Sequence, residues 1–256
     1  MDSARDAIIQ VRNLTAGYGE LVVIDDVSFD VGRGEVFVIL GGSGCGKSTL
    51  LKHMIGLLPP VAGEVLIDGE DIVAAGGADR ERLLRKFGVT FQAGALFGSM
   101  TLLENVCLPL EEFTRLPQEA VRLVALMKLD LVGLREYAEH MPAALSGGMQ
   151  KRAAIARAIA LDPEILFMDE PSAGLDPVTS AGLDELILSL AESLDVTFVI
   201  VTHELPSIRA VADRVIMLRQ ETKKIAAEGS PAELSENRDD PWVWNFFNRQ
   251  VGATDQ

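Results

Sequence analysis

The stretch Gly41-Gly42-Ser43-Gly44-Cys45-Gly46-Lys47-Ser48-Thr49 decides the fold of this chain. It matches the pattern G-x-x-x-x-G-K-[ST], whose glycines let successive backbone N–H groups turn toward a bound phosphate. An apolar run at residues 36–40 precedes it, and a run with helical character at residues 49–55 follows it. This strand–loop–helix order would place the phosphate at the positive end of a helix. The stretch therefore predicts a nucleoside-triphosphate site rather than a glycine-rich turn that binds nothing.

Two further features fit the same chemistry. Within the loop, Lys47 is expected to reach the β- and γ-phosphate oxygens, and the Ser48 hydroxyl to bind Mg²⁺. Residues 165–168 form an apolar strand that ends in Asp169-Glu170. Because Mg²⁺ needs an acidic partner at a strand tip beside the phosphate loop, Asp169 suits that role. Glu170 points elsewhere and could accept a proton from the water that attacks the γ-phosphate.

A second anion site is predicted where Leu145-Ser146-Gly147-Gly148-Met149 opens a long helical stretch. Ser146 is a good N-cap, and the two glycines expose backbone N–H groups at the start of the helix. Taken alone, the pentapeptide is equally consistent with a capped helix and nothing more. Together with the phosphate loop, it suggests a γ-phosphate held from two sides, which two copies arranged head-to-tail about a two-fold axis would achieve.

Composition narrows the class of protein. With 256 residues, 48% of them hydrophobic, the chain can form one large α/β domain or two small ones. The formal net charge of −15 argues against nucleic acid and against direct adhesion to anionic lipid, so another protein would have to hold the chain at a membrane. The first six residues do not resemble a secretory signal, and no apolar run reaches the ~18 residues of a membrane span. Two cysteines, Cys45 and Cys107, imply no disulfide framework and fit a reducing cytoplasm.

The order of periodic segments predicts the architecture. Short β-like runs at residues 8–11, 22–24, 27–31 and 63–69 suggest a small antiparallel sheet beside the phosphate loop. From about residue 101 to 160 the pattern is helical, and Leu123, Leu126 and Met127 follow helical spacing. Apolar strands at 165–168, 197–201 and 215–218 alternate with helical stretches. We therefore expect an α/β fold with a largely parallel, doubly wound sheet and a helical insert.

In chain order, these motifs resemble those of ABC-type ATPase subunits over roughly residues 8–235. The matching positions are Tyr18, the phosphate loop, Gln92, the Leu145–Met149 signature, Asp169-Glu170, Ser172-Ala173-Gly174-Leu175-Asp176 and His203. Met149 departs from the commonest signature, which has Gln there, but it lies outside the Ser-Gly-Gly cradle. The resemblance implies a P-loop NTPase (RecA-like) core with a mostly parallel sheet, a small antiparallel β subdomain and a helical subdomain inserted at about 93–160. It also implies ATP hydrolysis with ATP and Mg²⁺.

The resemblance assigns roles to single residues that would otherwise have plainer explanations. Tyr18 would stack on adenine, although a turn tyrosine is ordinarily packing. Gln92 would sense Mg²⁺ or the lytic water, although it could be a solvated strand end. His203 would bond the γ-phosphate and steady Glu170, although a lone histidine is more often structural. Asp176 would cross a dimer interface, although it could merely cap the helix that begins near residue 177.

The implied assembly is a homodimer that sandwiches two Mg·ATP molecules. Nucleotide contacts are expected along Gly41–Thr49 and from Ser146, Gly147 and Gly148. Each site would draw Ser146 and Gly148 from one chain and the remaining catalytic set from the other, namely Lys47, Ser48, Gln92, Asp169, Glu170 and His203.

A closer resemblance links the chain to the ATPases of Mce-type (Mla-like) lipid transport systems. It rests on Phe91-Gln92-Ala93-Gly94-Ala95-Leu96-Phe97, on residues 100–106 and 108–110, and on residues 141–149. It implies a permease whose cytoplasmic helix docks near Gln92–Met100, against Leu96, Phe97 and Met100. A small cytoplasmic accessory subunit and an Mce-domain protein are further implied partners, on the cytoplasmic face of the inner membrane. The apolar run could instead pack the insert on the core.

Alternatives remain in other classes. Amino-acid and other small-solute transporters share part of the Gln92 loop, so another ABC importer or exporter is one alternative, and a non-transport ABC regulator is another. A P-loop kinase would explain neither Ser146-Gly147-Gly148 nor His203.

The tail at residues 236–256 is unusual because it contains both tryptophans. Asp240 can cap and Pro241 can begin a helix that carries Trp242, Val243, Phe246 and Phe247. Such an aromatic stripe is expected to dock on its own domain, on a second ATPase copy or on an accessory subunit.

Overall fold

The computed structural model describes residues 6–92 and 94–250, which divide into two compact units. Unit 1 comprises residues 6–76 and 199–250, and unit 2 comprises residues 77–198. Parts of three predictions lie outside the described residues: Ala93, where the helical subdomain was expected to begin, the N-terminal residues 1–5, and residues 251–256 of the tail. Each unit is described by itself.

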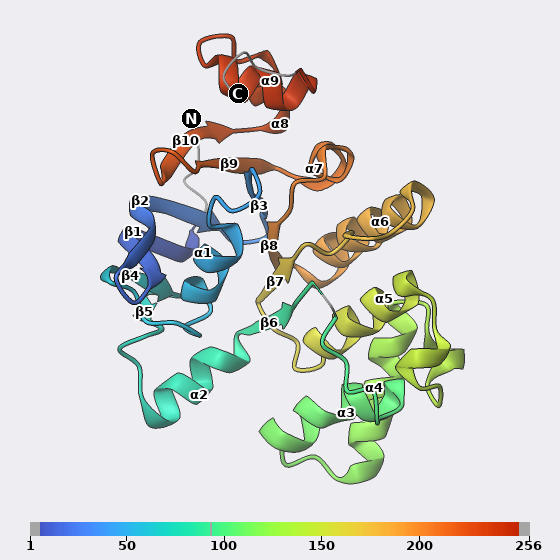
Figure 1. Cartoon of the computed structure of the whole chain (residues 1–256). Coiled ribbons are helices and arrows are strands. Elements are labelled where there is room, and N and C mark those ends of the chain that lie inside the picture. The colour runs from blue at the N-terminus through green and yellow to red at the C-terminus, as the bar shows by residue number, and fades with distance from the viewer. Residues whose placement is uncertain (1–5, 93, 251–256) are drawn as a thin grey trace. The chain divides into compact units, whose positions relative to one another are not determined.

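Unit 1 contains the predicted antiparallel sheet, with strand order β2-β1-β4-β5 (Figure 1). Its strands are β1 (Ala7–Tyr18), β2 (Leu21–Gly32), β4 (Ala62–Ile67) and β5 (Glu70–Asp71). The prediction of two separate runs at 22–24 and 27–31 is wrong, because both belong to β2. Asp26 takes a left-handed conformation (φ 51°) and the register with β1 shifts around it, so the strand bends there without ending.

The second set of strands in unit 1 leads into the phosphate loop. Strand β3 (Val36–Gly41) is buried along its whole length and pairs in parallel with β9 (Arg214–Arg219), and β10 (Lys224–Gly229) pairs antiparallel with β9. Helix α1 (Lys47–Met54) begins two residues before the predicted helical run, because Gly46 occupies the N-cap in a left-handed conformation (φ 103°). The chain returns from unit 2 through β8 (Thr197–Val201) and continues into α7 (Leu205–Val211).

The aromatic tail packs on unit 1 of its own chain. After α8 (Pro231–Glu236), helix α9 (Pro241–Asn248) begins as predicted, with Asp240 accepting from the amides of Trp242 (2.9 Å) and Val243 (3.4 Å). Val243 and Phe247 are buried. Arg219 of β9 pairs with Asp240 at 2.6 Å and lies 4.6 Å from the Trp242 ring, so β9 and α9 are joined by an ion pair and a cation–π contact.

Unit 2 contains the helical stretch. Helices α3 (Leu102–Phe113), α4 (Gln118–Leu131) and α5 (Gly147–Ala158) pack on one another (Figure 1), as the pattern from residue 101 to 160 predicted. They are accompanied by two short 3₁₀ turns, Arg135–Tyr137 and Pro142–Ala144. The rest of the unit comprises α2 (Gly77–Arg85), β6 (Phe87–Thr90), β7 (Ile165–Asp169) and α6 (Pro177–Leu194), with β6 parallel to β7.

The helical spacing of Leu123, Leu126 and Met127 is confirmed, because all three lie in α4, but it does not mark the buried face of the helix. Leu123 and Met127 are 57% and 55% exposed, whereas Val121, Ala125 and Leu129 are buried. The helix carries apolar residues on two faces, so spacing alone does not identify the buried one. Lys128 also lies buried on the inner side, where its ammonium pairs with Asp162 and so avoids the cost of an unpaired buried charge.

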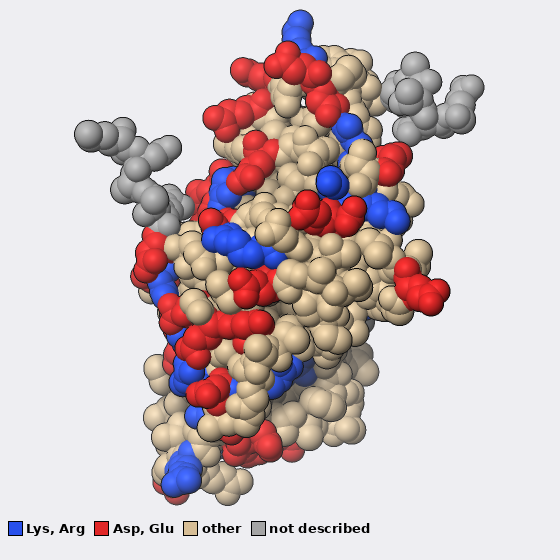
Figure 2. Space-filling view, turned by 90° about the vertical axis from the view of Figure 1, so that its left-hand side faces the viewer, with Lys and Arg blue, Asp and Glu red and all other residues tan. Residues whose placement is uncertain are grey.

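Figure 2 shows one face, on whose described part acidic and basic residues are interspersed without a continuous basic area. The prediction that nucleic acid is not a partner, which rests on the net charge of −15, stays a prediction. No helix within residues 6–92 and 94–250 combines the length and hydrophobicity that crossing a membrane requires.

Arg214 connects several strands of unit 1. Its guanidinium forms a two-pronged pair with the buried carboxylate of Glu35, at 2.7 and 2.9 Å, and lies 4.9 Å from the Phe37 ring. Glu35 also accepts the backbone N–H of Gly32 at 2.8 Å. A second carboxylate, that of Glu228, pairs with Arg214 from a more exposed position. The two glutamates are therefore a matched pair on one arginine that differ in burial.

Glu35→Ala should lower the free energy of unfolding by about 3 kcal/mol, because it removes the buried carboxylate that accepts from both the Arg214 guanidinium and the Gly32 amide. Glu228→Ala should cost less than about 1 kcal/mol, because that carboxylate is 42% exposed. Urea denaturation of both variants measures the difference. Equal losses would show that burial does not set the strength of these pairs.

Candidate active site

The phosphate loop, residues 41–49, joins β3 to α1 in unit 1. A Cβ on Gly41 would lie 2.5 Å from the Cys45 sulfur and 2.6 Å from the Leu218 carbonyl oxygen. A Cβ on Gly46 would meet side-chain atoms of the β2 residues Val23 and Ile24 at 2.7 Å. Packing therefore requires glycine at the two positions that the motif fixes. Between them the loop presents its backbone to solvent through the exposed residues Gly42, Ser43 and Gly44.

Lys47 lies across the loop that it follows. Its Nζ donates to the carbonyl oxygens of Gly41 (3.0 Å) and Gly42 (3.1 Å), and the side chain is largely buried. An ammonium group has three donors, so these bonds leave capacity for a phosphate oxygen. Ser48 follows in the first turn of α1, half-buried. Burial raises the pKa of the Cys45 thiol, so this residue contributes its backbone rather than a reactive thiolate.

Two other predicted residues lie in unit 1. Tyr18 is the last residue of β1 and is 46% exposed. Its hydroxyl lies 3.4 Å from the Thr49 hydroxyl, which connects it to the helix after the phosphate loop. His203 is exposed two residues beyond the end of β8. The preceding amide, that of Thr202, donates to the carbonyl of Ile39 at 3.3 Å, so His203 emerges beside the strand that enters the phosphate loop.

Asp169 and Glu170 form the acidic strand end in unit 2. Asp169 is the last residue of the fully buried strand β7, and both carboxylates belong to residues only 8% exposed. Glu170 takes a left-handed backbone conformation (φ 48°), which is unfavourable for a residue with a side chain. Its carbonyl accepts from the amide of Ala173 at 3.2 Å and from Nζ of Lys151 at 3.3 Å, and these bonds hold the turn.

Residues 94–100 form no helix or strand, and side chains of neighbouring helices fix them. Gln92 is exposed beyond the end of β6, and its carbonyl accepts from Nζ of Lys151. Arg157 donates to the carbonyls of Gly94 (3.2 Å) and Ala95 (2.8 Å). Both basic residues belong to α5, which starts at the signature.

Asn105 of α3 fixes the next part of this segment from a fully buried position. Its side-chain oxygen accepts the amide of Phe97 at 2.8 Å, and its side-chain nitrogen donates to the carbonyls of Phe97, Met100 and Thr101 at 3.1, 3.2 and 2.9 Å. Sequence reasoning missed Lys151, Arg157 and Asn105. The available signal for Lys151 and Arg157 was their position in a helical stretch that is otherwise rich in small residues, six positions apart.

The signature residues begin α5 as predicted. Ser146 is the N-cap and accepts the amide of Met149 at 3.3 Å. Gly147 is exposed, whereas Gly148 is buried, and a Cβ there would lie 2.4 Å from the Thr179 methyl carbon. The second glycine is therefore required by the close approach of α5 to the start of α6.

Asp176 caps α6, one of the two roles considered for it. Its carboxylate accepts the amides of Val178 and Thr179, both at 3.1 Å, and the Thr179 hydroxyl at 2.5 Å. The hydrogen bonds from Thr179 lower the pKa of Asp176. Thr179 thus contacts both the signature glycine and Asp176. A role of Asp176 across a dimer stays a prediction.

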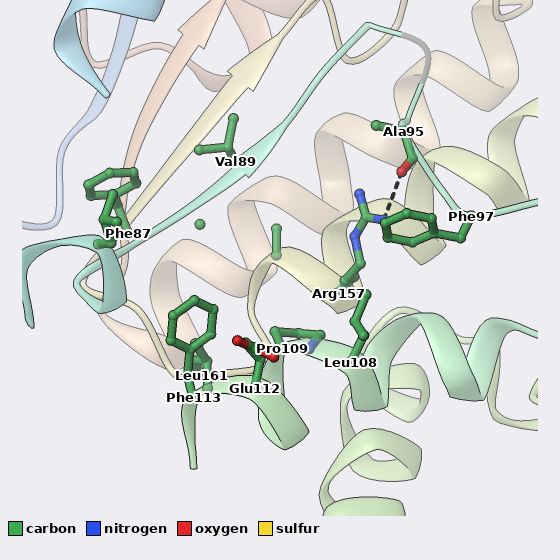
Figure 3. Close-up of a pocket in the computed structure, with 13 residues that line it drawn as sticks. Phe87, Val89, Ala95, Phe97, Leu108, Pro109, Glu112, Phe113, Arg157 and Leu161 are labelled. Carbon is green, nitrogen blue, oxygen red and sulfur yellow. Dashed lines mark hydrogen bonds between the residues drawn. The ribbon is translucent and has the colours of Figure 1, made fainter. Parts of the chain in front are cut away.

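An apolar cavity of about 550 Å³ lies beside the Gln92 segment in unit 2 (Figure 3). Its lining includes Ala95, Phe97, Leu108, Pro109, Glu112, Phe113 and Arg157. Phe97 is 49% exposed and lies over the Arg157 guanidinium, 5.8 Å from it. Leu96 and Met100, predicted with Phe97 as part of a docking surface, are half-buried and do not line this cavity.

Gly148→Ala should destabilise unit 2, because the new methyl group would overlap the Thr179 methyl carbon. Adding Thr179→Ser removes that methyl and keeps the hydroxyl that bonds Asp176. The double variant should therefore recover most of the loss in melting temperature, measured by calorimetry, whereas Thr179→Ser alone should change it little. A double variant as unstable as Gly148→Ala would contradict this steric explanation.

Comparison with known proteins agrees with these motifs. The ABC transporter family model matches residues 24–173. The probable ribonucleotide transport ATP-binding protein Mkl of Mycobacterium leprae is 43% identical over 245 residues, which are 95% of this chain and 70% of that protein. The intermembrane phospholipid transport system ATP-binding protein MlaF of Escherichia coli is 40% identical over 248 residues, 97% of this chain and 91% of MlaF.

A solved structure shows the same fold. The dimeric ATP-binding cassette MJ0796, in a post-hydrolysis state bound to ADP and Pi, aligns with a TM-score of 0.78 and 34% identity over 87% of this chain and 98% of that chain. This likeness confirms the predicted ABC-type α/β fold. Because the family model covers more than half of the sequence and both relatives align along nearly all of it, this chain belongs to the ABC transporter family and is an ATP-hydrolysing subunit.

Proposed function

We propose that this ATPase drives a separate membrane permease that transports phospholipid. The observation that carries the proposal is the alignment with MlaF, which covers nearly the whole of both chains. The Mkl relative is named for ribonucleotide transport, and only 70% of its length aligns with this chain. The Gln92 segment and the residues at 100–110, which carry the resemblance to lipid transport ATPases, further support phospholipid.

We propose that the phosphate loop of one copy and the Ser146–Gly148 signature of the other bind the same nucleotide within a head-to-tail dimer. The dimeric state of MJ0796 with ADP and Pi supports this arrangement. Tyr18 offers an exposed ring to adenine, and the loop at 41–49 offers backbone amides and Lys47 to the phosphates. Ser146, Gly147 and Gly148 of the partner copy would present the start of α5 to the γ-phosphate, with Asp176 crossing the interface.

The donors for Mg²⁺ fit that ion. Asp169 places a buried carboxylate at a strand end, Ser48 supplies a hydroxyl, and Gln92 supplies an amide oxygen. No group of three His, Cys, Asp or Glu gathers within the described residues. One carboxylate with a hydroxyl and an amide oxygen is a donor set expected for Mg²⁺, because this ion takes one or two protein carboxylates and completes its shell with phosphate oxygens and water. When bound, the ion would neutralise charge on the β- and γ-phosphates.

The chain's own residues would supply position and charge. Glu170 accepts the proton of the attacking water, a bond forms from that water oxygen to the γ-phosphorus, and the bond to the ADP oxygen breaks. Lys47 stabilises charge on the phosphates, and His203 bonds the γ-phosphate and steadies Glu170. Most of the rate enhancement therefore comes from orientation and electrostatic stabilisation.

Docking of the permease is proposed at the apolar cavity beside Gln92–Met100. Its lining combines aliphatic and aromatic side chains with one carboxylate, that of Glu112, as a groove for an amphipathic helix would. Held there, the ATPase would be peripheral on the cytoplasmic face of the inner membrane. A small cytoplasmic accessory subunit and an Mce-domain protein would complete the system.

Glu170→Gln should preserve ATP binding and reduce turnover by at least about 100-fold, because the amide cannot accept the water proton. ATP should then trap a dimer that size-exclusion chromatography with light scattering detects. Turnover close to that of the unchanged protein would show that Glu170 is not the base. A variant that stays monomeric with ATP bound, even in the permease complex, would contradict the proposed dimer.

Affinity purification from membranes tests both the docking site and the cargo. The unchanged ATPase should co-purify with an integral membrane protein and with phospholipid enriched over the bulk membrane, measured by mass spectrometry. Leu108→Asp, within the cavity, should abolish co-purification and keep basal ATP hydrolysis. Leu123→Asp, on the exposed face of α4, is the matched control and should retain the complex.

Three results would contradict this proposal. Loss of the complex in both variants would place docking elsewhere. A complex without enriched phospholipid whose proteoliposomes take up a labelled ribonucleotide would favour the cargo named for Mkl. Purification without any integral protein would favour a regulator that does not transport.

A further inference from the structure

Lys151 contacts the ends of two catalytic segments from the helix that begins at the signature. Its Nζ donates to the carbonyl of Gln92 and, at 3.3 Å, to that of Glu170. Gln92 follows β6 and Glu170 follows β7, and these strands pair in parallel, with Thr90 opposite Met168. One ammonium group therefore joins two neighbouring strand ends.

The carbonyls that Lys151 binds belong to peptides whose orientation matters. Glu170 holds a left-handed conformation, and a rotation of its peptide would redirect its carboxylate. The Gln92 carbonyl lies where the chain leaves the sheet and has no strand partner there. A cation bonded to both oxygens opposes rotation of either peptide, because charge-assisted hydrogen bonds in a half-buried position are strong.

The charge state of Lys151 agrees with this role. Burial lowers the pKa of the Lys151 ammonium, and the negative charges of Glu170 and Asp169 raise it in part. The two carboxylates thus favour the ammonium form that donates to both carbonyls.

We propose that Lys151 is a positioning residue for ATP hydrolysis that couples the signature helix to Gln92 and Glu170 of the same chain. The proposal rests on the proposed roles of those two residues. Ser146, at the start of α5, would contact the nucleotide bound by the partner copy. When the dimer closes, a displacement of α5 would then be transmitted through the Lys151 side chain to Glu170, the proposed base of the same chain.

Arg157 provides the internal comparison. It lies six residues further along α5 and binds the carbonyls of Gly94 and Ala95, and its guanidinium lies under the Phe97 ring at the docking cavity (Figure 3). The same helix therefore holds the Gln92 segment at two places. The contact of Lys151 is next to the base, and that of Arg157 is next to the proposed permease site.

Lys151→Met, in the full-length ATPase within its membrane complex, should lower kcat by about 10- to 100-fold, because small displacements of catalytic groups have effects of that size. The KM and the dissociation constant for ATP should stay within about twofold, because the phosphate loop lies in the other unit. Lys151→Arg should restore kcat to within about threefold, since a guanidinium can donate to both carbonyls. Arg157→Met should instead lose stimulation by the permease, because Arg157 lines the proposed docking cavity.

Lys128→Met controls for loss of a buried lysine, because Lys128 pairs with Asp162 away from the catalytic segments. It should lower the melting temperature and leave kcat unchanged at temperatures well below unfolding. If Lys151→Met does not fold, Lys151→Gln, which keeps an N–H donor but loses the charge and reach, takes its place with the same expected fall in kcat.

A kcat within twofold of the unchanged protein in Lys151→Met, or a fall in kcat that Lys151→Arg does not restore, would overturn the inference. Glu170→Gln separates this failure from that of the proposed function. If Glu170→Gln stalls turnover while Lys151→Met does not, only the role of Lys151 is wrong. If Glu170→Gln turns over normally, Glu170 is not the base, and the positioning role of Lys151 is then wrong as well.

Discussion

A backbone carbonyl just beyond the end of a strand no longer accepts from a neighbouring strand and needs another hydrogen-bond donor. In both units a lysine ammonium is such a donor. Lys47 bonds two carbonyls of the phosphate loop, and Lys151 bonds those of Gln92 and Glu170. Ordinary turns satisfy such groups with backbone amides or water. Here the ammonium bonds are added to backbone bonds such as that from the amide of Ala173 to the carbonyl of Glu170, so each segment is held by both.

Close packing imposes the second constraint. Gly41, Gly46 and Gly148 each face an atom that a methyl group would overlap, at 2.5, 2.7 and 2.4 Å. The glycines of both anion-binding elements therefore serve two purposes at once. They let neighbouring elements approach closely, and they leave backbone N–H groups without an overlying side chain. A substitution at these positions would disturb packing before it disturbed the nucleotide.

Local patterns predicted much of the fold and site, because caps and phosphate loops are encoded within a few residues. The helix starts at Ser146, Asp176 and Asp240 follow from cap chemistry, and the strand before Gly41 follows from an unbroken apolar run. The helix α4 was predicted, but its buried face could not be, because both faces carry apolar residues and only contacts distant in sequence select one. Lys151 escaped prediction because its partners Gln92 and Glu170 lie 59 and 19 residues away in the sequence. Asn105 escaped prediction because its partners lie within a loop without periodicity.

Helix α5 combines features that would otherwise need separate elements. Its first turn bears the signature, its second holds the carbonyls of Gln92 and Glu170, and its last reaches the apolar cavity through Arg157. An α-helix transmits displacement along its axis because each turn is hydrogen-bonded to the next. On the proposed roles, hydrolysis would depend on the position of Lys151, whereas the choice of permease would depend on the cavity lining around Arg157. If the permease docks as proposed, side chains of α3 such as Leu108 and Glu112 could change to suit a different permease while the contacts of Lys151 stayed the same.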